Sequence, residues 1–310
     1  TLGGANTYTG TTTIDEGALV VTGAINSANT ANVGDVFVGT GSANGSLTVA
    51  GGTVNATNTS APSLAVANSF GVNGFLNLTS GAINTTSELR LGTGSGGNAH
   101  MRIGGGTLTS GSWMVVGFNG DNSIVHQTGG AATISTNLMT IAAGGTASTG
   151  VYNLSGGTFG SAGGVYVGEN GYGTLNITGG TMTLGTNGAR IGRQAGSNGT
   201  LNLNAGNLTT TTVDKGAGSA TLSFNGGTLQ AAAATGTLIT GLNSANVFSG
   251  GATLNDGGFV VTVPQALLAP TGFGVSSVTI DDGGSGYVEN PIVKLIGGTG
   301  TGATATATVS

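Results

Sequence analysis

Apolar and polar residues alternate in short segments along most of this chain. In Leu47/Val49 and Leu175/Ile177, for example, one polar residue separates two apolar residues. A period of two is typical of β-strands that bury one face. Helical spacing of apolar residues is absent, and the 64 glycines would penalise long helices. The pattern therefore predicts an all-β chain.

These strands belong to a unit that recurs about every 25 residues. Each unit contains a short strand that ends at Gly or Ala, a polar turn, and a second alternating strand that leads into Gly-Gly-Thr. The residue after the first strand recurs at intervals of 24 to 28 residues, at Gly39, Ala67, Gly92, Gly117, Ala142, Gly168 and Gly192. A repeat of this length predicts a parallel β-helix, or β-solenoid, whose turns stack about 4.8 Å apart.

Alignment of the units predicts which side chains stack inside the solenoid. One inward ladder contains Val38, Val66, Leu91, Val116, Ile141, Val167 and Ile191, and another contains Val49, Leu78, Ile103, Gln127, Leu154, Ile177, Leu203 and Phe224. Gln127 interrupts the second ladder, so its buried amide needs partners, which we expect among the backbone groups of the adjoining corner. The Gly-Gly pairs fit tight corners that require positive φ.

Composition limits the possible partners. Charged residues make up only 5% of the chain, and six Lys and Arg stand against eleven Asp and Glu. This balance gives neither a nucleic-acid footprint nor a basic membrane patch, and no apolar run is long enough to span a bilayer. The Gly-rich stretches lack the Lys of a phosphate loop, so no cofactor is expected. Thr1 in place of Met suggests a processed product or an excised segment.

The opening residues carry a family resemblance. Residues 2–14, LGGANTYTGTTTI, continue to GALVV at 17–21, and this pattern closely resembles the autotransporter-associated β-strand repeat of bacterial surface and secreted proteins. Residues 242–269 resemble the companion segment that follows such arrays. The resemblance implies a right-handed β-helix in a passenger stalk, an adhesin or an exported fibrous protein, located outside the cell or on the bacterial surface.

The C-terminal segment differs from the repeats. Val275–Ile280, Pro291–Ile296 and Ala303–Val309 read as three strands separated by Gly-rich turns, and resemble a small β module of phage fibres and bacterial surface proteins. We therefore expect a solenoid over residues 1–271 and a small module over 272–310. Three such strands can hardly bury a core alone, so the module should dock on its own solenoid or on a neighbouring molecule.

Two surface groups are candidate contacts for a ligand or partner. His100, Arg102 and His126 fall on one outward patch, which could contact an anion or a carboxylated sugar, or be a plain ladder of polar residues. A second outward line runs through Phe37, Ala65, Arg90, Val115, Thr140, Tyr166 and Arg190. Its aromatic side chains could pack on a partner or stack on sugar rings, such as those of surface glycans, unless corner loops cover them.

Catalytic and metal-binding patterns are weak. Solenoids also include polysaccharide lyases and hydrolases, but these need converging carboxylates, and most acids here stand alone in their turn. No catalytic residue is predicted, and an enzyme is the least favoured reading. Asp281 and Asp282 could hold calcium, although an ordinary Asp-Gly turn is the preferred interpretation.

A structural protein that associates with itself is the preferred hypothesis. Repeat-like sequence begins by residue 2, so the first turn would expose an unpaired strand edge. Head-to-tail joining of this edge to the C-terminal module would build a filament. The strands assigned to the joint are those of Leu19, Val20, Val21, Ile292, Val293, Leu295, Ala305, Ala307 and Val309. An adhesin or glycan-binding stalk is the alternative.

Overall fold

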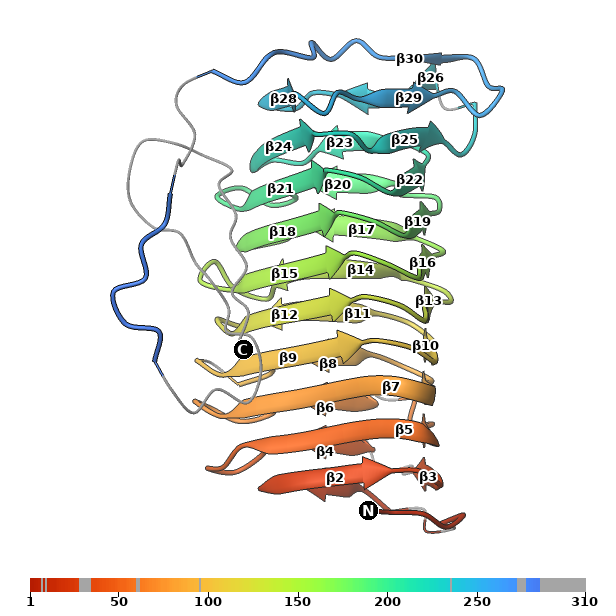
Figure 1. Ribbon diagram of the computed structural model, residues 1–310, viewed down its shortest axis with the longest axis vertical. Coiled ribbons are helices and arrows are strands. Elements are labelled where there is room, and N and C mark those ends of the chain that lie inside the picture. Colours follow the sequence, from red (N-terminus) through yellow and green to blue (C-terminus); the bar gives the residue numbers. More distant parts are fainter. Residues whose placement is uncertain are drawn as a thin grey trace. The chain divides into compact units, whose positions relative to one another are not determined.

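The computed structural model describes residues 1–6, 8, 10–27, 35–59, 62–94, 96–234, 236–271 and 277–284. The chain divides into two units, Thr1–Leu268 and Ala269–Ser310. The first unit is a column of stacked turns (Figure 1). All regular elements in the described ranges are strands, and none of these residues forms a helix that could cross a bilayer. The predicted all-β solenoid with about 25 residues per turn is confirmed.

Each turn contributes one strand to each of three columns. Column 1 contains β1 (Thr12–Ile14), β4 (Val36–Val38), β6 (Leu64–Val66), β8 (Leu89–Leu91), β11 (Met114–Phe118), β14 (Leu138–Ala143), β17 (Gly164–Val167), β20 (Ala189–Ile191), β23 (Val213–Lys215) and β27 (Ile239–Thr240). Column 2 contains β2 (Gly17–Val21), β9 (Asn98–Ile103), β12 (Asn122–Gln127), β15 (Thr149–Leu154), β18 (Tyr172–Ile177), β21 (Asn198–Leu203), β24 (Ser219–Phe224) and β28 (Ser244–Val247). Column 3 contains β3 (Ala24–Ser27), β10 (Thr107–Ser110), β13 (Ala131–Ile134), β16 (Thr158–Ser161), β19 (Thr181–Leu184), β22 (Asn207–Thr210), β25 (Thr228–Ala231) and β29 (Thr253–Asn255).

Two long strands, β5 (Gly45–Ala56) and β7 (Asn73–Thr85), belong to columns 2 and 3 together. Column 1 is therefore a sheet of ten strands, whereas columns 2 and 3 join into a sheet of 18 strands. A short extra pair, β26 (Gly236–Thr237) with β30 (Val261–Thr262), lies near the last turn. Every pairing between the strands is parallel and joins equivalent positions of successive turns, as in β9 with β12.

The core follows the predicted ladders. All seven residues of the inward ladder that begins at Val38 are fully buried. Gln127 is also fully buried, and its Nε2 donates to the backbone oxygen of Thr158 at 2.9 Å and to that of Gly129 at 3.3 Å. Its Oε1 accepts a hydrogen bond from the Tyr152 hydroxyl in the next turn at 2.6 Å. The backbone partners were predicted, whereas the tyrosine partner was not.

The corners explain the glycine content. Gly157 has a φ of 75°, and a Cβ at this position would lie 2.3 Å from the backbone oxygen of Gly130 in the turn below. Only glycine fits there. At the corner after column 1, Ala67 and Ala142 adopt φ values of 57° and 60°, where the other aligned turns have glycine. These two alanines occupy a left-handed conformation that is unfavourable for residues with a Cβ.

Stacked asparagines reinforce the outer surface. The side chains of Asn26, Asn55 and Asn84 are joined by hydrogen bonds of 2.7 and 2.8 Å. A second ladder joins Asn153, Asn176 and Asn202 at 2.7 and 2.8 Å. An amide that both donates and accepts can repeat without limit along a column, so each ladder satisfies its members without any charge.

Only a small part of the second unit is described. The first strand expected there, Val275–Ile280, is not formed in its described part, since residues 277–280 make no β-pairing. Val278 and Ile280, in the same segment, are exposed. The strands predicted at 291–296 and 303–309, which contain Ile292, Val293, Leu295, Ala305, Ala307 and Val309, lie outside the described residues.

Candidate functional site

The strand register brings together His100, Arg102 and His126, which we call the His–Arg patch. Arg102 on β9 pairs with His126 on β12, and His100 lies two residues before Arg102 on the same outward face. The rings of His100 and His126 meet edge to face, with 5.4 Å between their centroids. Asn153 continues the row in the next turn, with its Nδ2 at 3.2 Å from Nδ1 of His126.

The charge expected for this patch is not present at His100. Burial, together with the nearby His126 and Arg102, lowers the pKa of His100 to about 4. His100 is therefore neutral at pH 7 and adds no positive charge to the patch. Its Nε2 is buried without a partner in the described part of the chain. Arg102 remains exposed and has no ion-pair partner among the described residues.

The outward line on column 1 also forms as one row. The pairs Phe37–Ala65, Arg90–Val115 and Tyr166–Arg190 each lie side by side on neighbouring strands. Ala65, Val115 and Thr140 are nevertheless buried, and Phe37 and Tyr166 are only partly exposed. Val115 was expected to be exposed, and this expectation is wrong.

Side chains from the corners cover much of this row. Arg193 lies over the ring of Tyr166 at 4.5 Å, and Arg90 lies over the ring of Phe118 at the same distance. Arg193 is also paired with Glu169 at 2.7 Å, and Arg90 with Glu88. The ring face of Tyr166 that carries Arg193 is not available for stacking on a sugar.

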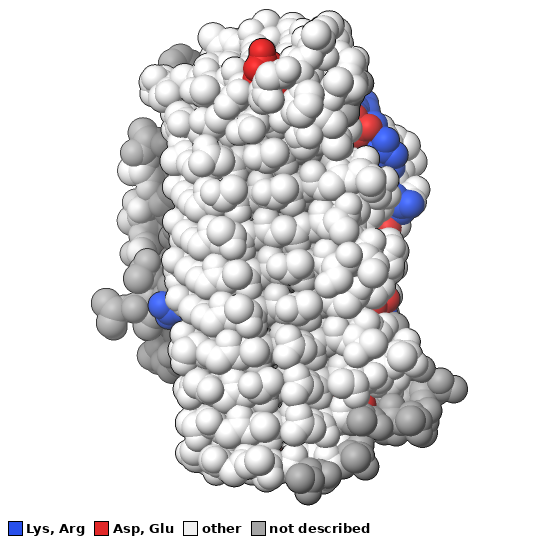
Figure 2. Space-filling view, turned by 90° about the vertical axis from the view of Figure 1, so that its right-hand side faces the viewer, with Lys and Arg blue, Asp and Glu red and all other residues white. Residues whose placement is uncertain are grey.

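Arg190 has an acidic partner that the sequence analysis did not include. Asp214 occupies the next position of the row and accepts two hydrogen bonds from Arg190, at 3.0 and 2.6 Å. Figure 2 shows that charged side chains gather along the edges of the first unit, whereas the face of column 3 is almost free of them. Because the arginines of column 1 are neutralised in place, this row does not form a strong positive surface.

The last turn of the first unit has an apolar end face. Leu254 on β29 is the tenth member of an inward ladder in column 3, and it is 40% exposed. The nine preceding members are each at most 2% exposed, and they are Ile25, Val54, Ile83, Leu108, Ala132, Phe159, Met182, Leu208 and Leu229. Phe248, Phe259, Val260 and Leu268 are exposed near this end, and Leu268 bridges Asn246 on the outer edge of β28. In the described chain β29 pairs only with β25, so its outer edge offers free main-chain groups.

The opposite end is formed by residues 2–6 rather than by the strand assigned to it. Leu2 bridges Val21, and the Leu2 amide donates to the backbone oxygen of Val20 at 2.7 Å. Ala5 similarly bridges Ala24. The edge of Leu19, Val20 and Val21 is thus partly occupied by residues 2–6. The assignment of Leu19, Val20 and Val21 to a joint between copies stays a prediction.

Little in the described residues resembles a catalytic or metal centre. Three acids are held in ion pairs with arginine, and Asp121 is buried, with its carboxylate accepting the Gly97 amide at 2.8 Å. Burial raises the pKa of Asp121 to about 6, against the opposing effect of backbone donors. No group of three His, Cys, Asp or Glu that could hold a metal occurs in the described ranges. Asp282 accepts the Gly284 amide at 2.8 Å, the contact of an ordinary Asp-Gly turn.

Comparison of the chain with protein-family models, with curated proteins and with solved structures finds no match. The assignment of the fold as a β-solenoid rests on the parallel pairing of strands in the three columns.

Proposed function

We propose that this chain is an extracellular structural protein, a self-associating subunit of a bacterial surface fibre of the passenger type that its repeats resemble. The observation that carries the proposal is the exposure of Leu254. It occupies a core position, and it is exposed because no described strand pairs with the outer edge of β29. A core residue left open at the end of a ladder is accommodated best by another turn of the same kind.

The occupant that fits this end is the first turn of a second copy. The two ends share a cross-section, because the same columns run through the first unit. Residues 2–6 carry Leu2, which packs partly buried against the core beside Val21, and their outer edge pairs with no described strand. Leu268 already bridges Asn246 on the outer edge of β28. Stacking the first turn on β29 and on the segment that ends at Leu268 would continue the parallel ladders and bury Leu254 and Leu268.

The distribution of exposed apolar side chains favours an end contact over a lateral one. Among the described residues of the first unit, eight large apolar side chains are exposed, and five of them lie between residues 248 and 268, at one end of the column. These five are Phe248, Leu254, Phe259, Val260 and Leu268. The flanks are dominated by Thr, Asn and Gly, which give neither a large apolar patch nor a strong field.

Electron microscopy and sedimentation velocity of the purified chain would test the proposal. We expect fibres one solenoid wide from the wild-type chain, and monomers from the double variant Val260→Asp/Leu268→Asp, which places two charges on the end face. Phe70→Asp is the matched control, because Phe70 is 79% exposed on a corner away from the last turn. A wild-type chain that stays monomeric at high concentration would overturn the proposal, as would fibres that form equally well with both end-face charges.

A further inference from the structure

One lysine occupies a position at which the earlier members of its ladder have aliphatic side chains. Lys215 on β23 pairs with Ile191 and continues the inward ladder of column 1. The eight earlier members of this ladder are Ile14, Val38, Val66, Leu91, Val116, Ile141, Val167 and Ile191. An ammonium group cannot replace an aliphatic side chain in the core without a large desolvation penalty. Lys215 must therefore have access to a more polar space.

The corner beside Lys215 provides that space. The segment that links columns 1 and 2 covers residues 192–197 in the turn below, but only 216–218 in the turn of Lys215. In the turn above, the register of β23 with β27 places Gly241 next to Lys215. Nothing lies within 4 Å of a Cβ built on Gly241. A short corner above a longer one, with a glycine at the position over Lys215, leaves a ledge that the lysine side chain lines.

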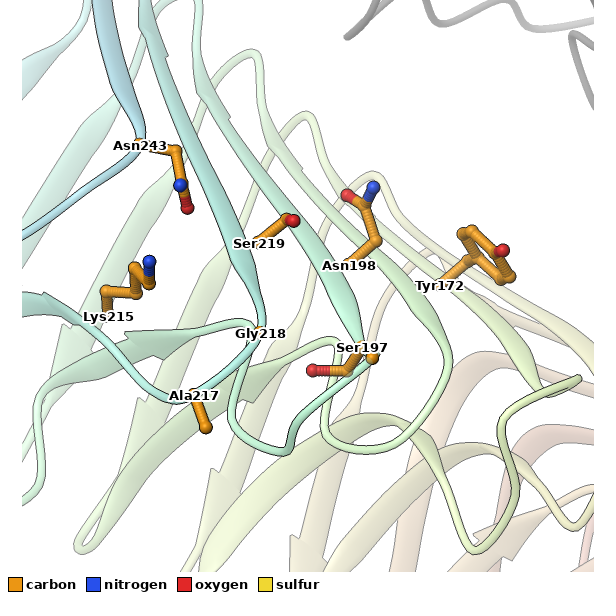
Figure 3. Close-up of a pocket in the computed structure, with 9 residues that line it drawn as sticks. Tyr172, Ser197, Asn198, Lys215, Ala217, Gly218, Ser219 and Asn243 are labelled. Atoms are coloured by element: carbon orange, nitrogen blue, oxygen red, sulfur yellow. The ribbon is translucent and has the colours of Figure 1, made fainter.

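The ledge forms a polar pocket of about 350 Å³ (Figure 3). Tyr172, Asn198 and Ser219 stack along its side, because they begin three successive strands of column 2. Lys215 and Asn243 line its upper end (Figure 3). The volume lies at the lower end of the range of about 300–1,000 Å³ that is usual for small-molecule sites.

Lys215 is the charged group of this pocket that has no counter-ion. Three arginines of the described chain, Arg90, Arg190 and Arg193, are each paired with an acid. Lys215 makes neither an ion pair nor a side-chain hydrogen bond with any described residue. The adjacent Asp214 points to the outer face, where it is bound by Arg190. The pocket thus holds a positive charge that an anionic group of a ligand could neutralise.

The other lining groups suit a polyhydroxylated ligand. The side-chain oxygen of Asn243, Oδ1, accepts a hydrogen bond from the backbone amide of Ala220 at 2.9 Å. This contact orients the Asn243 side chain and leaves its NH₂ group as a donor. Ser219 and Asn198 are exposed and add hydroxyl and amide groups. Tyr172 is 54% exposed, and its ring lies two turns, or about 10 Å, from the level of Lys215. An aromatic ring with amides and hydroxyls on one side is a common surface for a sugar ring.

We propose that this pocket binds an acidic oligosaccharide, with the carboxylate of a uronic acid on the Lys215 ammonium and a neighbouring sugar ring against Tyr172. The carboxylate forms a charge-assisted hydrogen bond with Nζ, and the Asn243 and Ser219 side chains bind hydroxyl groups. The two-turn span requires a ligand of at least two rings. This site lies at a corner of the column, so it does not depend on end-to-end association.

Calorimetry and saturation-transfer NMR with cellobiouronic acid and with cellobiose would test the site. The two disaccharides differ only in a carboxylate that replaces a hydroxymethyl group. We expect the acid to bind at millimolar concentration and the neutral sugar to bind at least about tenfold more weakly, as for the loss of one hydrogen bond to a charged group.

Lys215→Met keeps most of the length of the side chain, removes the charge, and should lower affinity for the acid by at least about tenfold. Arg102→Gln is the matched control, because Arg102 is the other Lys or Arg side chain without an ion pair in the described chain and lies on a different face. It should leave binding unchanged. Equal binding of the two disaccharides, no binding of the acid, or unchanged affinity in Lys215→Met would each overturn the proposal.

Discussion

The hydrogen bond between Tyr152 and Gln127 gives the sharpest test of how the core tolerates polarity. Both side chains are fully buried, and among the described residues the Tyr152 hydroxyl is the only side-chain donor to Oε1 of Gln127. Burial raises the pKa of Tyr152, so the phenol keeps its proton and remains a donor at neutral pH. Tyr152→Phe removes this donor and changes almost nothing in volume.

The expected loss of stability in each variant depends on which buried polar group is left without a hydrogen-bond partner. In Tyr152→Phe, the buried amide oxygen of Gln127 loses its partner, which should lower the free energy of unfolding by about 1–3 kcal/mol. Gln127→Leu should cost a similar amount, because it leaves the Tyr152 hydroxyl buried and unpaired. In the double variant both polar groups are absent and the ladder is apolar, so the loss should be much smaller than the sum of the two single losses.

Equilibrium denaturation of the four proteins, followed by circular dichroism and by the fluorescence of the single residue Trp113, would measure this coupling. The two probes must give coincident transitions for the free energies to be comparable. Single losses below about 0.5 kcal/mol, or losses that simply add in the double variant, would refute the account of Gln127 as a satisfied core amide.

Two further results are expected. The folded-state pKa of Asp121 is raised to about 6, so the free energy of unfolding falls as pH rises through that value. The folded-state pKa of His100 is lowered from 6.5 to about 4, so the free energy of unfolding falls as pH drops below 6.5. The two effects oppose each other between pH 4 and 6, so Asp121→Asn should give stability that rises with pH over this range in denaturant titrations, and an unchanged flat profile would contradict the assignment. Ala142 has a positive φ, which glycine adopts without strain, whereas Ala132 lies in a strand. Ala142→Gly should therefore lower the free energy of unfolding by at least about 1 kcal/mol less than Ala132→Gly does, as measured by denaturation midpoints. Equal losses of stability in the two variants would count against strain at Ala142.

The register of this protein could be predicted because two independent signals agree. Alternation identifies which side chains point inward, and the Gly or Ala after each column 1 strand fixes the alignment between turns. Val38 and Arg102 were placed correctly in this way. Extending the same alignment by one turn would also have found Asp214 opposite Arg190, since the spacing is that of the repeat.

Burial of outward side chains and the shape of corners could not be predicted in the same way. Alternation specifies the face on which a side chain lies, but it does not specify what covers that face. His100 and Val115 are both outward and both buried. The pocket at Lys215 depends on a difference in length between two adjacent corners and on a missing side chain at Gly241, and neither feature changes the periodic pattern.

The direction of the ladder hydrogen bonds determines how the column responds to force. The hydrogen bonds between paired strands run roughly perpendicular to the strands, so in this fold they point along the column axis. Tension between the two ends therefore acts on one turn at a time, and each turn that detaches releases roughly 80 Å of extended chain. A sideways load is instead shared by three columns and the continuous core between them. The column resists bending, and under tension it lengthens turn by turn.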